Sequence, residues 1–173
     1  MIIERTYAVS DIHGHIEPFA TRLPKFVLLS DYVDRGPASA EVLAIVRDLQ
    51  RRFPGRVTAL LGNHDDWFLD WPEGDDEDFS WLLGDAHLGT VKSFIDPSEL
   101  AHALGHEDPD SNASALDGPT MNHNINRAIL TSHPELIQWL RKLPRVHETE
   151  DHIFVHTGVD EEAGEQWRAA TPD

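Results

Sequence analysis

Short apolar runs that end in polar residues recur along the first part of the chain. They predict strands over residues 2–9, 26–29 and 57–61. Between the second and third runs, residues 39–52 carry apolar side chains at helical spacing, and a Pro-Gly stop signal follows. This β-α-β order is typical of an α/β sheet, in which ligands bind at the carboxyl ends of the strands.

The pattern becomes helical in the middle of the chain. Asp96 is a predicted N-cap, with Glu99 in the capping-box position of the helix that follows. Helical spacing also predicts helices over residues 122–130 and 134–143, and the Trp and Leu stripe of the second is typical of a core. We interpret residues 96–143 as a helical cap beside the sheet. A strand is predicted again at IFV, directly before His156.

Composition limits the classes of function. A length of 173 residues with 40% hydrophobic residues suits one domain, residues 1–173. A net charge of −17 argues against nucleic acid as a partner, and no apolar stretch is long enough for a membrane span. The chain has no cysteine and its first residues lack the features of a signal peptide, so a cytoplasmic protein is expected.

Four polar motifs stand at the ends of the four predicted strands. They are Asp11-Ile12-His13-Gly14, Asp31-Tyr32-Val33-Asp34-Arg35-Gly36, Gly62-Asn63-His64-Asp65 and Val155-His156-Thr157-Gly158. A single motif of this kind is more often structural than functional. Four of them in this order, each at a strand end, indicate one site.

The residue types suit two divalent metal ions. Two metals about 3.5–4 Å apart need a carboxylate that can bridge them, and Asp31 fits that role. Asp11 and His13 would bind one metal, and Asn63 and His156 the other. Mixed nitrogen and oxygen ligands favour manganese, with iron or zinc as alternatives, over calcium. A water held between the metals would lose a proton near neutral pH and act as the nucleophile.

Three further residues complete a hydrolytic site. His64 could protonate the leaving oxygen, with Asp34 accepting its other ring N–H, and Arg35 could bind two phosphoryl oxygens. The simpler alternative is that Asp34 and Arg35 are solvated charges in a turn before Gly36-Pro37.

These motifs closely resemble the signature blocks of the calcineurin-like metallophosphoesterases. The short DRG and VHTG forms resemble the bacterial serine/threonine-phosphatase branch and its relatives that cleave diadenosine tetraphosphate, over residues 7–158. The resemblance implies an αββα sandwich and a two-metal phosphomonoesterase or pyrophosphohydrolase. It places eight residues: Asp11, His13, Asp31, Asn63 and His156 as metal ligands, His64 and Asp34 as the acid pair, and Arg35 as a phosphate contact.

The chain departs from the family pattern in three places. Ser30 stands where the family usually has Gly, and the segment between Asp11 and Asp31 is too irregular for the usual full helix. A C-terminal block with Trp-x-Arg and Gly-His-Thr is absent. We therefore expect a C-terminally truncated domain that lacks part of the second sheet and holds its second metal weakly. An open sheet edge would also permit a homodimer.

Eight histidines have no motif around them. Each is expected to be solvated or at a helix end rather than a substitute ligand. They are His15, His87, His102, His106, His123, His133, His147 and His152.

The leading hypothesis is a dinuclear-metal-dependent phosphoesterase of serine/threonine-phosphatase type. A metal-bound hydroxide would attack a phosphorylated protein or a small phosphoester. The alternatives are a dinucleoside-polyphosphate hydrolase and a truncated, non-catalytic metal-binding paralogue. An aromatic surface for adenine would favour the first alternative, and the intact acid pair counts against the second.

Overall fold

The fold consists of two small sheets and several helices. A computed structural model describes residues 6–9, 25–74, 77–84, 87–105, 116–159 and 161–167. The strands of this part of the chain are β1 (Thr6–Val9), β2 (Lys25–Leu28), β3 (Val57–Ala59), β4 (Val146–Glu148) and β5 (Ile153–Val155). Its helices are α1 (Ser39–Arg52), α2 (Asn63–Asp70), α3 (Leu88–Phe94), α4 (Pro97–Ala103), α5 (Gly118–Ser132) and α6 (Pro134–Leu140), with 3-10 helices η1 (Trp71–Glu73) and η2 (Glu161–Gln166).

Strand β2 is the centre of a parallel three-stranded sheet. Its neighbours are β1 and β3, with Phe26 in register with Tyr7 on one side and Val57 on the other. The three carboxyl ends therefore lie along one edge of the sheet. The predicted strands are confirmed with changed bounds: β2 begins and ends one residue earlier than predicted, and β3 ends two residues earlier. Residues 2–5 of the first prediction lie outside the described residues.

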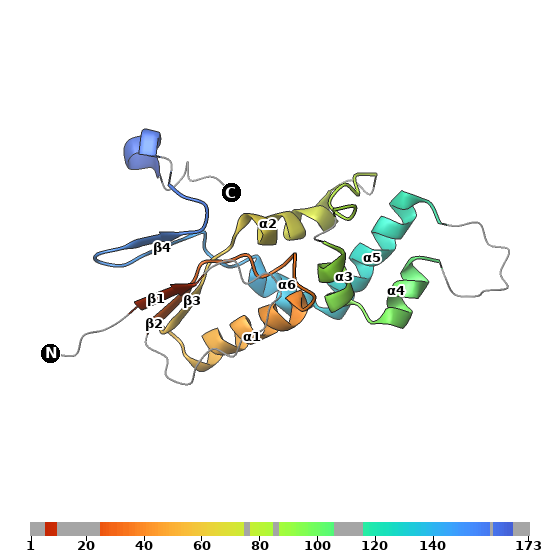
Figure 1. Cartoon of the computed structure of the whole chain (residues 1–173), viewed down its shortest axis with the longest axis horizontal. Helices are drawn as coiled ribbons and strands as arrows, with labels where there is room; N and C mark the ends of the chain where they lie inside the picture. Colours follow the sequence, from red (N-terminus) through yellow and green to blue (C-terminus); the bar gives the residue numbers. More distant parts are fainter. Residues whose placement is uncertain are drawn as a thin grey trace.

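Helix α1 begins and ends at the residues that the apolar spacing predicts. Val42, Leu43 and Val46 are buried on its inner face. This face packs on β3, α3 and α6, so α1 and α6 form a helical layer against the parallel sheet (Figure 1). The burial of these branched side chains stabilises the packing of α1 on its neighbours.

The helices of the second half agree with the sequence pattern in position but not in length. Asp96 caps α4, because its Oδ1 accepts hydrogen bonds from the N–H groups of Ser98 and Glu99 at 2.8 and 3.1 Å. Helix α5 is longer than predicted at both ends, and α6 ends three residues before the predicted position 143. Helices α3, α4 and α5 extend to one side of the sheet in Figure 1.

The antiparallel strands β4 and β5 form a hairpin near the parallel sheet (Figure 1). The N–H of Leu61 donates to the carbonyl of Pro144 at 2.9 Å, which ties the segment after β3 to the start of the hairpin. The predicted strand at residues 153–155 is β5. The architecture is a mixed α/β fold, as the sequence predicts, and within the described residues no helix combines the length and the hydropathy needed to span a bilayer.

Candidate active site

The loop after β2 has an unusual backbone. The φ angles of Ser30, Asp31, Asp34 and Arg35 are 101°, 54°, 67° and 59°. Each such angle costs a residue with a side chain roughly 1–3 kcal/mol, and such angles cluster at functional sites. Contacts with the rest of the protein must therefore stabilise this loop.

Asp65, in the first turn of α2, supplies several of these contacts. The N–H groups of Asp31 and Gly62 donate to Asp65 Oδ2 at 3.1 Å, and the N–H groups of Tyr32 and Val33 donate to Oδ1 at 3.0 and 3.4 Å. Burial raises the pKa of Asp65 to about 7, although the N–H groups act to lower it. This one carboxylate joins the loop after β2 to the loop after β3.

Gly62 allows the two loops to approach each other closely. A Cβ at this position would lie 2.1 Å from Ser30 Oγ and 2.6 Å from Asp31 Oδ1. Any side chain here would displace Asp31. The absence of a side chain therefore lets Asn63, the next residue, lie beside Asp31.

Three of the predicted metal ligands converge. His156 Nε2 lies 3.1 Å from Asp31 Oδ1 and 3.1 Å from Asn63 Oδ1, although the three residues follow three different strands. Neighbouring ligands of an octahedral ion with bonds near 2.1 Å lie about 3 Å apart, so this spacing suits a divalent cation. The described residues contain no metal-binding cluster of three His, Asp or Glu side chains, since the third donor here is the Asn63 amide. Asp11 and His13 lie outside the described residues.

The predicted acid pair is also in contact. His64 Nδ1 lies 2.6 Å from Asp34 Oδ2, and it carries the shared hydrogen because a carboxylate accepts. Thr90 fixes Asp34 further: its hydroxyl donates to Asp34 Oδ1 at 3.0 Å and accepts from the Asp34 N–H at 2.8 Å. Asp34 is fully buried, so it is not a solvated turn charge. Arg35 is exposed, and its Nη2 donates to His64 Nε2 at 3.4 Å.

The sequence analysis missed three residues of this site. Asp65 belongs to a quoted motif, but its role as an acceptor for loop N–H groups becomes visible only in the fold. Thr90 and His87 reach Asp34 from α3, with His87 Nδ1 at 2.9 Å from Asp34 Oδ2. The expectation for His87 is confirmed as a helix-end position, because it is the N-cap of α3. It is wrong as a solvated side chain, since only 15% of that side chain is exposed.

A groove with aromatic walls lies beside His64. The Trp67 side chain is 51% exposed, and its ring centre lies 5.1 Å from that of His64. The groove has a volume of about 390 Å³. Its lining residues are Trp67, Asp70, Trp71, Gly74, Asp78, Ser80 and Trp81.

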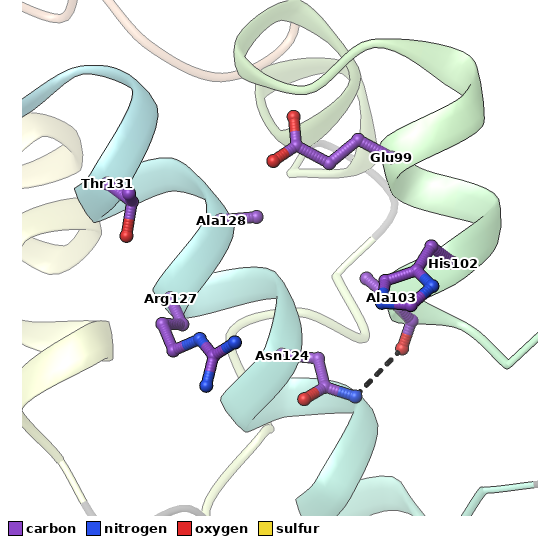
Figure 2. A pocket seen from close by; sticks show the side chains of 7 residues that line it. All are labelled: Glu99, His102, Ala103, Asn124, Arg127, Ala128 and Thr131. Carbon is purple, nitrogen blue, oxygen red and sulfur yellow. Dashed lines mark hydrogen bonds between the residues drawn. The ribbon is translucent and has the colours of Figure 1, made fainter.

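A second cavity lies between α4 and α5, away from the strand ends (Figures 1 and 2). Its volume is about 170 Å³, and Asn124 Nδ2 donates across it to the Ala103 carbonyl at 3.4 Å. Figure 2 shows Glu99 and Arg127 on opposite walls. None of the predicted site residues lines this cavity, so the strand ends hold the candidate active site.

Carboxylate, amide and imidazole ligands beside a His–Asp pair and an arginine are typical of metal-dependent hydrolases. The chain matches the calcineurin-like phosphoesterase family over residues 4–170 and belongs to it. This membership supports a phosphoester hydrolase, and the family is generally dependent on two metal ions.

Similar proteins carry two kinds of name. The chain is 39% identical over 165 residues to a symmetrical bis(5'-nucleosyl)-tetraphosphatase of Stutzerimonas stutzeri, covering 89% of this chain and 44% of that protein. A protein of the same name from Aromatoleum aromaticum is 28% identical over 162 residues, with 88% and 44% covered. A serine/threonine-protein phosphatase 4 catalytic subunit from Eremothecium gossypii is 35% identical over 63 residues, 32% of this chain and 20% of that protein. The chain thus spans less than half the length of these relatives.

Proposed function

We propose that the chain hydrolyses phosphomonoesters with two divalent metal ions, as a serine/threonine-phosphatase-like enzyme. The observation that carries this proposal is the convergence of Asp31 Oδ1 and Asn63 Oδ1 on His156 Nε2, each at 3.1 Å. The acid pair lies beside this cluster, because Asn63 and His64 are adjacent in the first turn of α2. One proposed metal ligand and the proposed proton donor are thus neighbours on the same helix.

Asp31, Asn63 and His156 would hold one metal, and Asp31 would share the other with Asp11 and His13. Manganese is the ion we propose, because the ligands are a mixture of oxygen and nitrogen donors. When bound, the metals supply positive charge for the phosphoryl oxygens and an activated water.

The chain's own residues handle the leaving group. With a proton on both ring nitrogens, His64 would donate the Nε2 proton to the leaving oxygen as the P–O bond breaks, while the water oxygen adds to phosphorus. A proton from that water restores His64 in the net reaction. Asp34 keeps the His64 ring oriented through the 2.6 Å contact, and the Arg35 guanidinium would bind the phosphoryl oxygens.

A second candidate function is hydrolysis of a dinucleoside polyphosphate. The exposed Trp67 ring beside His64 favours it, since a nucleobase on the leaving group could stack there. The names of the two bacterial relatives point the same way. An open groove is equally able to take a peptide, so the phosphomonoesterase stays the main proposal.

The test is hydrolysis of p-nitrophenyl phosphate with manganese, on a sample whose bound metal is measured. We expect turnover that falls at least about 100-fold in Asp31→Asn and stays within about twofold in Asp66→Asn, the matched control on α2. Metal bound without turnover would contradict the proposal and favour a non-catalytic metal-binding protein. Comparing diadenosine tetraphosphate with a phosphoserine peptide by kcat/KM then separates the two substrate classes.

A further inference from the structure

Asp34 has a second histidine in contact with it. His87 Nδ1 lies 2.9 Å from Asp34 Oδ2, the same oxygen that His64 Nδ1 approaches at 2.6 Å. The other oxygen of Asp34 accepts from Thr90. The buried Asp34 carboxylate is therefore surrounded by three polar side chains: His64 and His87 at Oδ2 and Thr90 at Oδ1.

The His87 ring is held in place from both sides. It stacks on Trp81, with ring centres 4.4 Å apart and an interplanar angle of 30°. Gly84 leaves room for it, since a Cβ there would lie 2.3 Å from His87 Cδ2. His87 Nδ1 is buried, and Asp34 is the polar group within reach of it among the described residues.

We propose that His87 is a positioning residue for the general acid, an inference that rests on the proposed function. His87 Nδ1 lies 2.9 Å from Asp34 Oδ2, in a contact that has ion-pair length but is poorly aligned for a hydrogen bond. With Thr90 on the other oxygen, His87 prevents rotation of the carboxylate. Asp34 then holds the His64 ring with Nε2 facing the Arg35 guanidinium, the phosphate contact of the proposed function, so that the acid lies beside the leaving oxygen.

This role predicts a dependence on the leaving group. A phenolate that is stable without a proton, as in p-nitrophenyl phosphate, does not need a well-placed acid, whereas phenyl phosphate does. Loss of a residue that orients a catalytic group typically costs about 10-fold or more. We expect His87→Ala to lower kcat on phenyl phosphate about 10-fold and kcat on p-nitrophenyl phosphate less than about threefold, with KM little changed.

Two conservative variants sharpen the kinetic test. An Asn amide nitrogen can occupy the place of Nδ1, and a Gln amide nitrogen the place of Nε2. We expect His87→Asn to restore most of the rate on phenyl phosphate and His87→Gln to resemble His87→Ala, while His102→Ala, on exposed α4, leaves both rates unchanged. An equal loss on both substrates, or equal rates for the Asn and Gln variants, would overturn the proposal.

A measurement without turnover separates this inference from the proposed function. In ¹⁵N-histidine NMR spectra of the metal-free chain, His87 should carry its hydrogen on Nδ1, and Asp34→Asn should shift that signal. His87→Ala should in turn shift the Nδ1 signal of His64. A His87 signal that Asp34→Asn does not move overturns the positioning role. An inactive wild-type chain with both shifts present would overturn the proposed function but keep the Asp34–His87 contact.

Discussion

Ser30 has the largest positive φ among the described non-glycine residues. Its φ of 101° lies where glycine is favoured, and its hydroxyl is buried without a hydrogen-bond partner among the described residues. Glycine would adopt this backbone conformation without steric cost. A serine at position 30 therefore lowers the stability of the loop, and its hydroxyl makes no hydrogen bond in the described structure that would compensate.

We expect Ser30→Gly to stabilise the protein by about 1 kcal/mol. Relief of roughly 1–3 kcal/mol of strain outweighs the extra freedom that glycine gives the unfolded chain, about 0.4–1 kcal/mol. Urea unfolding measures the change, and hydrolysis should persist because Asp31 keeps its contacts. Ser93→Gly, within helix α3, is the control and should destabilise, since Ser93 donates to the Thr90 carbonyl. A Ser30→Gly protein less stable than wild type would show that the loop is not strained at this position.

Asp65 stabilises the loop after β2, whereas Ser30 strains it. Removing its carboxylate in Asp65→Ala leaves the buried N–H groups of Asp31, Tyr32 and Gly62 without their acceptor. Unsatisfied buried groups cost about 1–3 kcal/mol each, so we expect a loss of about 3 kcal/mol or more in the free energy of unfolding.

The neighbouring residue provides the control for Asp65. Asp66 pairs with Arg145 near the surface at 2.7 Å, and Asp66→Ala should cost at most about 1 kcal/mol. Chemical denaturation measures both variants. Similar losses for the two would mean that the bonds of Asp65 to the loop add little stability.

At the scale of elements, η1 and α5 are joined by one buried polar contact. Trp71 Nε1 donates to Asn122 Oδ1 at 2.8 Å, and Asn122 is 1% exposed. Trp71 also stacks on Trp81, which in turn stacks on His87. The contact thus ties α5 to the aromatic side chains behind the acid pair.

We expect Asn122→Ala to lower the free energy of unfolding by about 1–3 kcal/mol, because it leaves the Trp71 N–H buried without its acceptor. Asn124→Ala on the same helix is the matched control, since its bond to the Ala103 carbonyl is long, at 3.4 Å, and half-buried. Thermal unfolding followed by tryptophan fluorescence measures both. Equal stabilities of the two variants would contradict a structural role for this contact.

The helices that could be predicted are those whose stability comes from the local sequence pattern rather than from contacts with distant residues. The spacing of apolar residues predicts α1 correctly because a long helix repeats its pattern over several turns. Helix α2 was missed because its first turn, Asn63 to Asp66, is polar and is stabilised by Asp65 binding distant N–H groups. Helix α3 was missed because it is short and packs mainly through tertiary contacts with α1 and α5.

In the candidate active site, too, the features set by local sequence could be predicted and those set by tertiary contacts could not. Strand-end motifs were enough to predict that Asp31 and Asn63 meet, since the parallel strands β2 and β3 bring their carboxyl ends to one edge. His156 joins them from β5 of the separate antiparallel hairpin, which that rule does not cover. Nothing local marks His87, which reaches Asp34 only because Gly84 and Trp81 shape its surroundings.

At the scale of the whole molecule, charge is the dominant property. The net charge of −17 opposes compaction of the chain and attracts cations to the metal ligands. Salt screens both effects over a Debye length of about 10 Å at 0.1 M. Stability and metal affinity should therefore respond to salt in opposite directions.

We expect the urea midpoint of the metal-free chain to rise between about 0.01 and 0.3 M potassium chloride, while the Kd for Mn²⁺ increases about fivefold or more. Denaturation and calorimetric titration measure the two quantities. A variant with Glu150→Lys and Asp151→Lys, on the exposed hairpin turn, carries less net charge and should show a smaller response in both. A midpoint that falls with salt would mean that specific ion pairs, such as Arg47–Glu135 at 2.7 Å, outweigh the general repulsion. Since exposed pairs of this kind contribute about 0–1 kcal/mol each, we expect the net charge to decide the sign.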